Sequence, residues 1–101
     1  MEFSVTTTGE QTELVLNGDL QIMYANEMRD VLLQHLTTVQ NLTINLTEIT
    51  NIDVCGFQLL YATRLSAKKM SKNVVFNTEN AAVLREIAAE NGFSLDRLIQ
   101  Q

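Results

Sequence analysis

The chain has 101 residues, of which 46% are hydrophobic and 19% are charged, and its formal net charge at neutral pH is −5. This length and composition fit one globular domain spanning residues 1–101. The acidic balance argues against binding nucleic acid or an anionic membrane surface, because both need clustered Lys and Arg.

The first half of the chain predicts two strands, a helix and a third strand. Residues 3–7 and 13–16 are short alternating or apolar runs with a glycine-containing turn between them, which indicates an antiparallel pair. From Met23 onward apolar residues recur at spacings of three and four, which predicts an amphipathic helix over residues 23–38. Residues 41–46 alternate apolar and polar side chains, as a half-exposed strand does, and the polar residues after them predict a turn.

The second half predicts a long helix over residues 54–71, a strand over 74–76, and helices over 79–91 and 95–99. Asn91-Gly92 is a typical stop for the third helix. The positions expected to face inward are Leu59, Leu60, Thr63, Ala67 and Met70 on the long helix, and Ala82, Val83, Ile87 and Ala88 on the next.

The resulting order is strand, strand, helix, strand, helix, strand, helix, helix. Strands that alternate with helices imply right-handed crossovers, and therefore an α/β fold with a mainly parallel sheet. Whether the helices cover one face of the sheet or both stays open at this stage.

The junction between the third strand and the long helix reads NIDVCGF. Asp53 stands where a helix N-cap is expected, and its carboxylate can accept a hydrogen bond from the first turn. Gly56 lowers helix propensity there but permits close backbone approach. Two interpretations follow: a capped turn with a packing glycine, or a phosphate pocket made by free N–H groups at the helix start.

This junction resembles the central motif of STAS domains, found in sulfate transporter tails and bacterial anti-sigma factor antagonists. A strand, a polar turn, Ile52-Asp53, two small residues, Gly56 and a long helix follow in the same order. The similarity covers nearly the whole chain, from the opening strands to the third helix. It implies a small, mixed, mainly parallel sheet of four strands with about four helices packed on it.

In the anti-sigma factor antagonists a hydroxyl side chain in this motif accepts phosphate from the partner kinase. Asp53 and Gly56 match the motif, whereas Val54 and Cys55 stand between them and neither has a hydroxyl. The resemblance therefore implies the fold and the binding surface without the usual phosphorylation. Whether Thr50 or Cys55 is modified instead stays open.

Catalytic and metal chemistry have little support in the sequence. Cys55 is the only cysteine and His35, the only histidine, falls on the preceding predicted helix. Nothing connects them as a catalytic pair, and together they provide no metal-ligand cluster. We therefore expect no enzymatic activity, no metal and no cofactor. Cys55 is interpreted as structural, with a thiol sensor as an alternative. The lone cysteine and the absence of a signal peptide or membrane span predict a cytosolic protein.

The outer side of the long helix is the predicted partner-binding surface. An aromatic residue flanked by Arg and Lys is typical of a protein-binding anchor with a charged rim. The residues assigned to this surface are Phe57, Gln58, Tyr61, Arg64, Leu65 and Lys68. Most basic residues fall within positions 64–85, which indicates an acidic partner. Alternatively, basic side chains near a helix C-terminus only complement its dipole.

The resemblance implies a non-enzymatic module for protein–protein interaction in bacterial signal transduction. The expected partner is an anti-sigma factor or a GHKL-type kinase, or a chemotaxis-type signalling protein. An alternative is a cytosolic STAS subunit of a lipid-transporting ABC system, which binds and regulates the ATPase.

Overall fold

The computed structural model describes residues 1–79 and 81–99. Its four strands are β1 (Glu2–Thr8), β2 (Gln11–Leu20), β3 (Asn41–Ile52) and β4 (Asn73–Asn77). They form one sheet in the order β1-β2-β3-β4, in which β1 is antiparallel to β2 and the other neighbours are parallel. The predicted α/β fold with a mixed, mainly parallel four-stranded sheet is confirmed.

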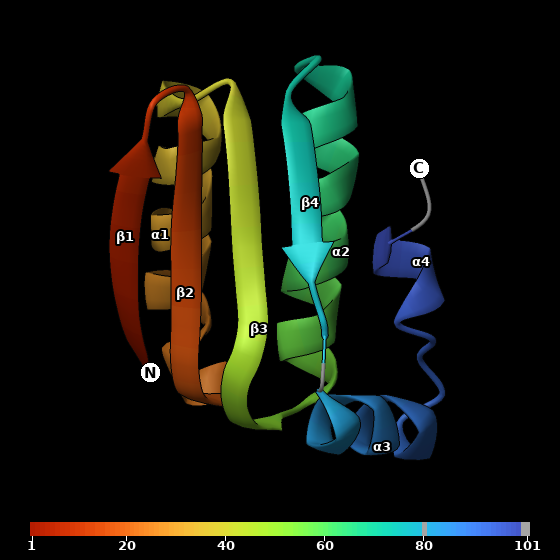
Figure 1. Cartoon of the computed structure of the whole chain (residues 1–101). Helices are drawn as coiled ribbons and strands as arrows, with labels where there is room; N and C mark the ends of the chain where they lie inside the picture. Colours follow the sequence, from red (N-terminus) through yellow and green to blue (C-terminus); the bar gives the residue numbers. More distant parts are fainter. Residues whose placement is uncertain (80, 100–101) are drawn as a thin grey trace.

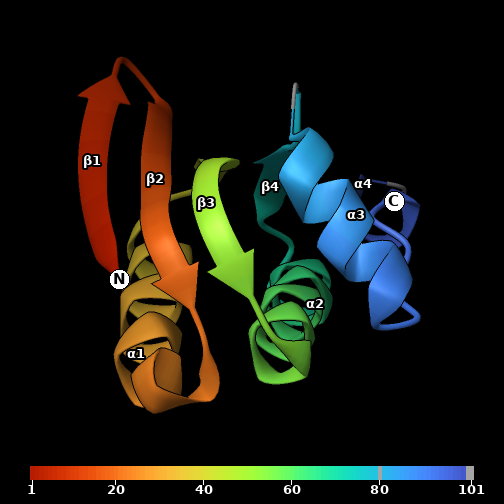
Figure 2. The same ribbon diagram turned by 90° about the horizontal axis from the view of Figure 1, so that it is seen from below.

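The helical elements are η1 (Ile22–Tyr24), α1 (Ala25–Thr38), α2 (Val54–Lys69), α3 (Ala82–Glu90) and α4 (Asp96–Ile99). The long helices α1 and α2 lie side by side on one face of the sheet, behind the strands in Figure 1 and below them in Figure 2. The short helices α3 and α4 lie at the β4 side of the molecule. The opposite face of the sheet carries half-buried or exposed side chains such as Thr43, Asn45 and Val75.

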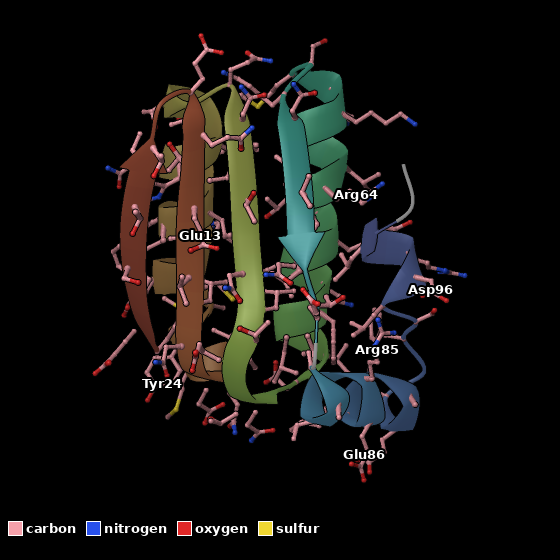
Figure 3. The ribbon with its side chains drawn as sticks, in the orientation of Figure 1. Glu13, Tyr24, Arg64, Arg85, Glu86 and Asp96 are labelled. Carbon is pink, nitrogen blue, oxygen red and sulfur yellow. The ribbon has the colours of Figure 1, made fainter. Side chains whose placement is uncertain are left out.

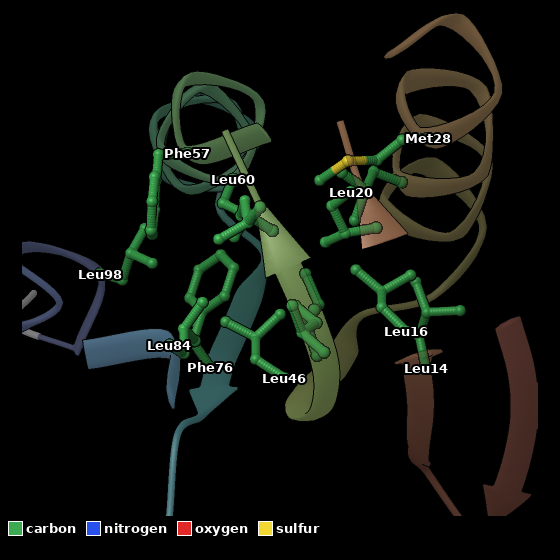
Figure 4. Packing of buried hydrophobic residues seen from close by; sticks show 14 of the residues in the cluster. Leu14, Leu16, Leu20, Met28, Leu46, Phe57, Leu60, Phe76, Leu84 and Leu98 are labelled. Carbon is green, nitrogen blue, oxygen red and sulfur yellow. The ribbon is translucent and has the colours of Figure 1, made fainter. Parts of the chain in front are cut away.

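The core forms between the sheet and the two long helices because the strands alternate. Leu42, Ile44 and Leu46 of β3 are all buried on the helix side, as predicted. They belong to one buried cluster with side chains of the two long helices, among them Leu32 and Leu60. Figure 4 shows part of this cluster, including Leu46 of β3 and Leu60 of α2. Each such leucine contributes about 1.5–3 kcal/mol relative to an exposed one.

β3 continues to Ile52, so the turn predicted after residue 46 was wrong. β2 is also longer than predicted, and the two strands stay paired as far as Leu20 and Ile52. Register shifts interrupt the ladder, and Gly18 at one of them has φ +93°, which glycine adopts readily. The irregular ladder breaks the period-two burial of β3 after Leu46, so the sequence alone predicts a turn.

α3 begins at Ala82 rather than at residue 79. The Glu79 N–H donates to Asn77 Oδ1 at 3.0 Å, which makes a turn after β4. Asn80, also within the predicted helix, lies outside the described residues. The end of α3 is confirmed: Gly92 has φ +77° and the Phe93 N–H donates to the Ala88 carbonyl at 2.8 Å.

The inner faces of α2 and α3 differ from the prediction at three positions. Met70 is exposed because α2 ends at Lys69, one residue before it. Ala82 and Val83 are exposed, whereas Leu84 is buried instead. The reason is that α3 packs across the end of the sheet against β3, where Leu84 joins the same buried cluster as Phe76 of β4 (Figure 4).

Candidate functional site

Asp53 is the N-cap of α2, as its position in the sequence predicts. Its carboxylate accepts a hydrogen bond from the Gly56 N–H at 3.0 Å, and its carbonyl accepts one from the Phe57 N–H at 3.1 Å. A carboxylate in this place satisfies a free amide and interacts favourably with the helix dipole. An external anion would have to compete with this carboxylate for the first turn.

Gly56 lies where the first turn of α2 meets the ends of β2 and β3. A Cβ atom at this position would lie 2.5 Å from the Leu20 carbonyl oxygen and 2.5 Å from Ile52 Cγ1. Both distances are far below van der Waals contact, and the Leu20 oxygen belongs to the backbone of a buried strand. The glycine is therefore required for close packing, which supports the interpretation of this junction as a capped turn.

Between these two residues, Val54 is 39% exposed and Cys55 is half-buried with a free thiol. His35 lies elsewhere: its Nδ1 donates to the Val31 carbonyl at 2.7 Å, and its ring makes an edge contact with Phe3 of β1. The imidazole is thus engaged on the β1 side of α1 and does not form a pair with Cys55.

Phe57 is a core residue, so its predicted place on the exposed partner-binding surface was wrong. Its side chain is only 2% exposed, and its ring stacks on Phe93 with centroids 5.1 Å apart. Helical position alone did not show this, because the cover over Phe57 comes from the segment after α3. Beside the stacked rings is an apolar pocket of about 170 Å³. Its lining residues are Phe57, Tyr61, Phe93, Ser94, Leu95, Arg97 and Leu98.

A second hollow, here called the basic groove, runs along the C-terminal half of α2 towards β4 and α4. It has a volume of about 450 Å³ and is lined by Tyr61, Arg64, Leu65, Ala67, Lys68, Lys72, Asn73, Val74 and Arg97. Tyr61 and Arg97 border both hollows, so the apolar pocket opens beside the groove. Tyr61 is 36% exposed and Leu65 48%.

Of the residues predicted to bind a partner, the structure brings Tyr61, Arg64, Leu65 and Lys68 together in the basic groove. Gln58 is exposed but lines neither hollow. Arg64 is half-buried, and its guanidinium donates to the carbonyl of Leu98 in α4. Figure 3 shows Arg64 on the side of α2 nearest α4. Arg64 therefore holds α4 against α2 as well as bordering the groove.

Arg97 and the α4 side of the pocket were missed by sequence reasoning. The only local signal was the short apolar pair Leu95 and Leu98, with Arg97 between them. That pattern does not indicate which helix α4 packs against. The basic cluster is correspondingly different from the predicted one, because Lys69 and Arg85 lie outside the groove and Arg97 lies within it.

Within residues 1–79 and 81–99, no three His, Cys, Asp or Glu side chains gather in a way that could hold a metal ion. None of the helices in these ranges combines the length and apolar character that crossing a bilayer requires.

The family model described as Mlab, STAS domain, matches residues 3–99. The chain belongs to this STAS-domain family. Comparison with curated proteins gave no match.

Solved structures with the same fold are similar over most of this STAS domain. A putative anti-sigma factor antagonist from Thermotoga maritima has a TM-score of 0.74 at 18% identity, covering 96% of this chain and 82% of that one. The Bacillus cell fate determinant SpoIIAA in its phosphorylated form has a TM-score of 0.66 at 15% identity, covering 90% and 84%. Mglu has a TM-score of 0.64 at 22% identity, covering 72% of this chain and only 18% of Mglu. At these identities the likeness shows the fold.

Proposed function

We propose that this STAS domain is a non-enzymatic, cytoplasmic module that regulates bacterial signal transduction by binding another protein through α2. The observation that carries the proposal is the outer side of α2, where Tyr61 and Leu65 are exposed beside Arg64 and Lys68. Aromatic and aliphatic anchors with a charged rim are the composition of protein-binding surfaces. The anti-sigma factor antagonists among the structural neighbours support a regulatory role of this kind.

We include the start of α2 in the proposed surface only through the exposed Val54 and the half-buried Asp53, and we expect no phosphoryl switch at the two positions before Gly56. Val54 is exposed but has no hydroxyl, and Cys55 is a half-buried thiol. A phosphate in such a segment would add about −1.5 to −2 charges beside Asp53. Without it, the output is set by the abundance of the protein or by the state of its partner. The proposed partners are an anti-sigma factor or GHKL-type kinase, or a chemotaxis-type signalling protein.

A second candidate is a STAS subunit of a lipid-transporting ABC system that binds and regulates the ATPase. The missing hydroxyl favours it, because such a subunit stays bound constitutively and needs no phosphorylation. Affinity purification from the source cell distinguishes the two candidates. A retained ATPase supports the second, and a retained regulator of a sigma factor supports the first.

The test of the α2 surface compares capture of the native partner by three proteins. These are the wild type, the double variant Tyr61→Ala with Lys68→Ala, and a control carrying Leu33→Ala on the exposed side of α1. Arg64 is left unchanged because its substitution would also release α4. We expect the double variant to capture at least about tenfold less partner, since interface anchors contribute about 2 kcal/mol or more. Undiminished capture by a folded double variant would show that α2 is not the docking surface.

A further inference from the structure

The basic groove concentrates positive charge in a protein whose net charge is negative. Four of the seven Lys and Arg residues line it: Arg64, Lys68, Lys72 and Arg97. None of the twelve Asp and Glu residues lines either the groove or the apolar pocket. Asp96, the acid of α4, is exposed and stands outside both hollows. Such separation of charge produces a local positive field that an acidic ligand complements.

The charges in the groove are not neutralised within the described parts of the chain. The salt bridge between Arg29 and Asp30 lies on the surface of α1, at 4.0 Å, and involves no residue of the groove. Arg64 donates to a backbone carbonyl, which carries no net negative charge to offset that of the guanidinium. The groove therefore presents cations that favour a bound carboxylate.

The apolar pocket beside the groove is large enough for one aromatic side chain. Its volume is about 170 Å³, and an engineered protein cavity of about 150 Å³ binds benzene. Phe57 and Phe93 form one wall as a stacked pair, and Leu95 and Leu98 extend the apolar lining. A ring that enters here can stack on an aromatic face.

We infer that the two hollows together bind an acidic peptide segment carrying one aromatic anchor, contributed by a partner protein. This inference rests on the proposed function and names the chemistry of the partner. The aromatic side chain fills the apolar pocket, and Asp or Glu residues next to it in the sequence lie along Arg64, Lys68, Lys72 and Arg97. Tyr61 and Arg97 join the two halves of the site, because both line both hollows. A polyanionic nucleic acid fits less well, since the chain as a whole carries a net charge of −5.

The direct test measures binding of fluorescein-labelled synthetic peptides to the whole chain by fluorescence anisotropy. The reference probe is an acidic peptide of about twelve residues with one central Trp. One comparison peptide replaces Trp with Ala, a second replaces every Asp and Glu with Lys, and a single-stranded oligonucleotide of equal charge is a third probe. We expect the reference peptide to bind about tenfold more tightly than each of the other three.

Raising the salt concentration from about 50 mM to about 500 mM should weaken binding of the reference peptide several-fold, because it screens the exposed groove charges. Equal affinity for the Lys peptide or the Ala peptide, or tighter binding of the oligonucleotide, would overturn the inference. Absence of detectable binding of the reference peptide would overturn it as well.

Substitutions in the basic groove and in the apolar pocket test whether the peptide binds there. Lys68→Glu with Arg97→Glu reverses two exposed charges of the groove, and Ser94→Trp fills the apolar pocket from its exposed edge. Each variant should bind the reference peptide about tenfold more weakly than the wild type does. Arg29→Glu on α1 should bind it with an affinity within about twofold of the wild type. Circular dichroism confirms folding, and the charge variant keeps the test valid if Ser94→Trp does not fold. Equal losses in Arg29→Glu and in the groove variant would show a nonspecific charge effect and sink the inference.

The peptide-binding experiment can fail or succeed independently of the native-capture experiment that tests the proposed function. A native partner that depends on Tyr61 and Lys68, together with a reference peptide that fails to bind, refutes the acidic-peptide inference and leaves the proposed function standing. A reference peptide that binds the groove, together with native capture that ignores α2, refutes the proposed function alone.

Discussion

The two ends of α2 have opposite environments. At its start Gly56 is buried against the Leu20 carbonyl, and Asp53 caps the first turn. In its C-terminal half Leu65 and Lys68 are exposed and border the basic groove. One helix thus has a first turn in which Gly56 is fixed by packing, and later turns whose exposed side chains form the proposed docking surface. Asp53 and Gly56, the two positions that match the STAS motif, therefore have structural roles in the fold.

The two ends of α2 also differ in how the helix is terminated. The first turn uses a side-chain cap and needs a residue without a Cβ. At the other end α2 stops at Lys69; Ser71, two residues later, has φ +56°, and the Lys72 N–H donates to the Ala67 carbonyl at 2.9 Å. This is the hydrogen bond of a glycine-type helix stop, made here by a residue for which the left-handed conformation costs energy.

The largest expected effect is that of Phe57→Ala at the packed end. Removing a buried aromatic side chain costs about 3–5 kcal/mol of unfolding free energy, a large part of the stability of a small domain. Gln58→Ala, at the neighbouring exposed position, should change the unfolding free energy by less than about 0.5 kcal/mol. Urea denaturation of both variants measures the difference. A loss below about 1 kcal/mol for Phe57→Ala would contradict its place in the core.

Gly56→Ala should have the second largest effect. The new Cβ would overlap Leu20 and Ile52, which costs about 1–3 kcal/mol, against a gain of about 1 kcal/mol in helix propensity. We therefore expect a net loss of up to about 2 kcal/mol in the urea unfolding free energy. Ala62→Gly, at an exposed site of the same helix, serves as the reverse control and should cost about 1 kcal/mol from propensity alone. A more stable Gly56→Ala protein would show that the packing there yields easily.

Ser71→Gly should have the smallest effect, with the opposite sign. Glycine adopts φ +56° without steric cost, and its added freedom in the unfolded chain offsets part of that gain. A net stabilisation of about 0.5–1 kcal/mol follows, seen as a rise of several degrees in the melting temperature. Ser66→Gly, inside α2, should instead lower the melting temperature. If both substitutions lower it, the stop at Ser71 is not strained.

Local patterns predicted the parts of this molecule that depend on neighbouring residues. Asp53 as a cap, the alternation from Leu42 to Leu46 and the stop at Gly92 all follow from local backbone chemistry. The burial of Phe57 does not, because its cover comes from Phe93, which is distant in the sequence. The second half of β3 was missed for a similar reason, since its pairing depends on an irregular ladder with β2.

The candidate site was predicted in part. Tyr61, Arg64, Leu65 and Lys68 share one helix, so their proximity follows from helical spacing alone. Arg97 joins them only because α4 folds back onto α2, which is a tertiary event. A sequence pattern identifies one side of a groove more readily than the element that faces it.

The hydrogen bond from Arg64 to the Leu98 carbonyl connects the basic groove to α4. The same guanidinium lines the basic groove, so a carboxylate bound there, as we infer, would share its N–H donors with the Leu98 carbonyl. Under this inference, binding in the groove would be coupled to the attachment of the single turn of α4 through this one side chain. Amide hydrogen exchange in that turn would report on a ligand bound some distance along α2.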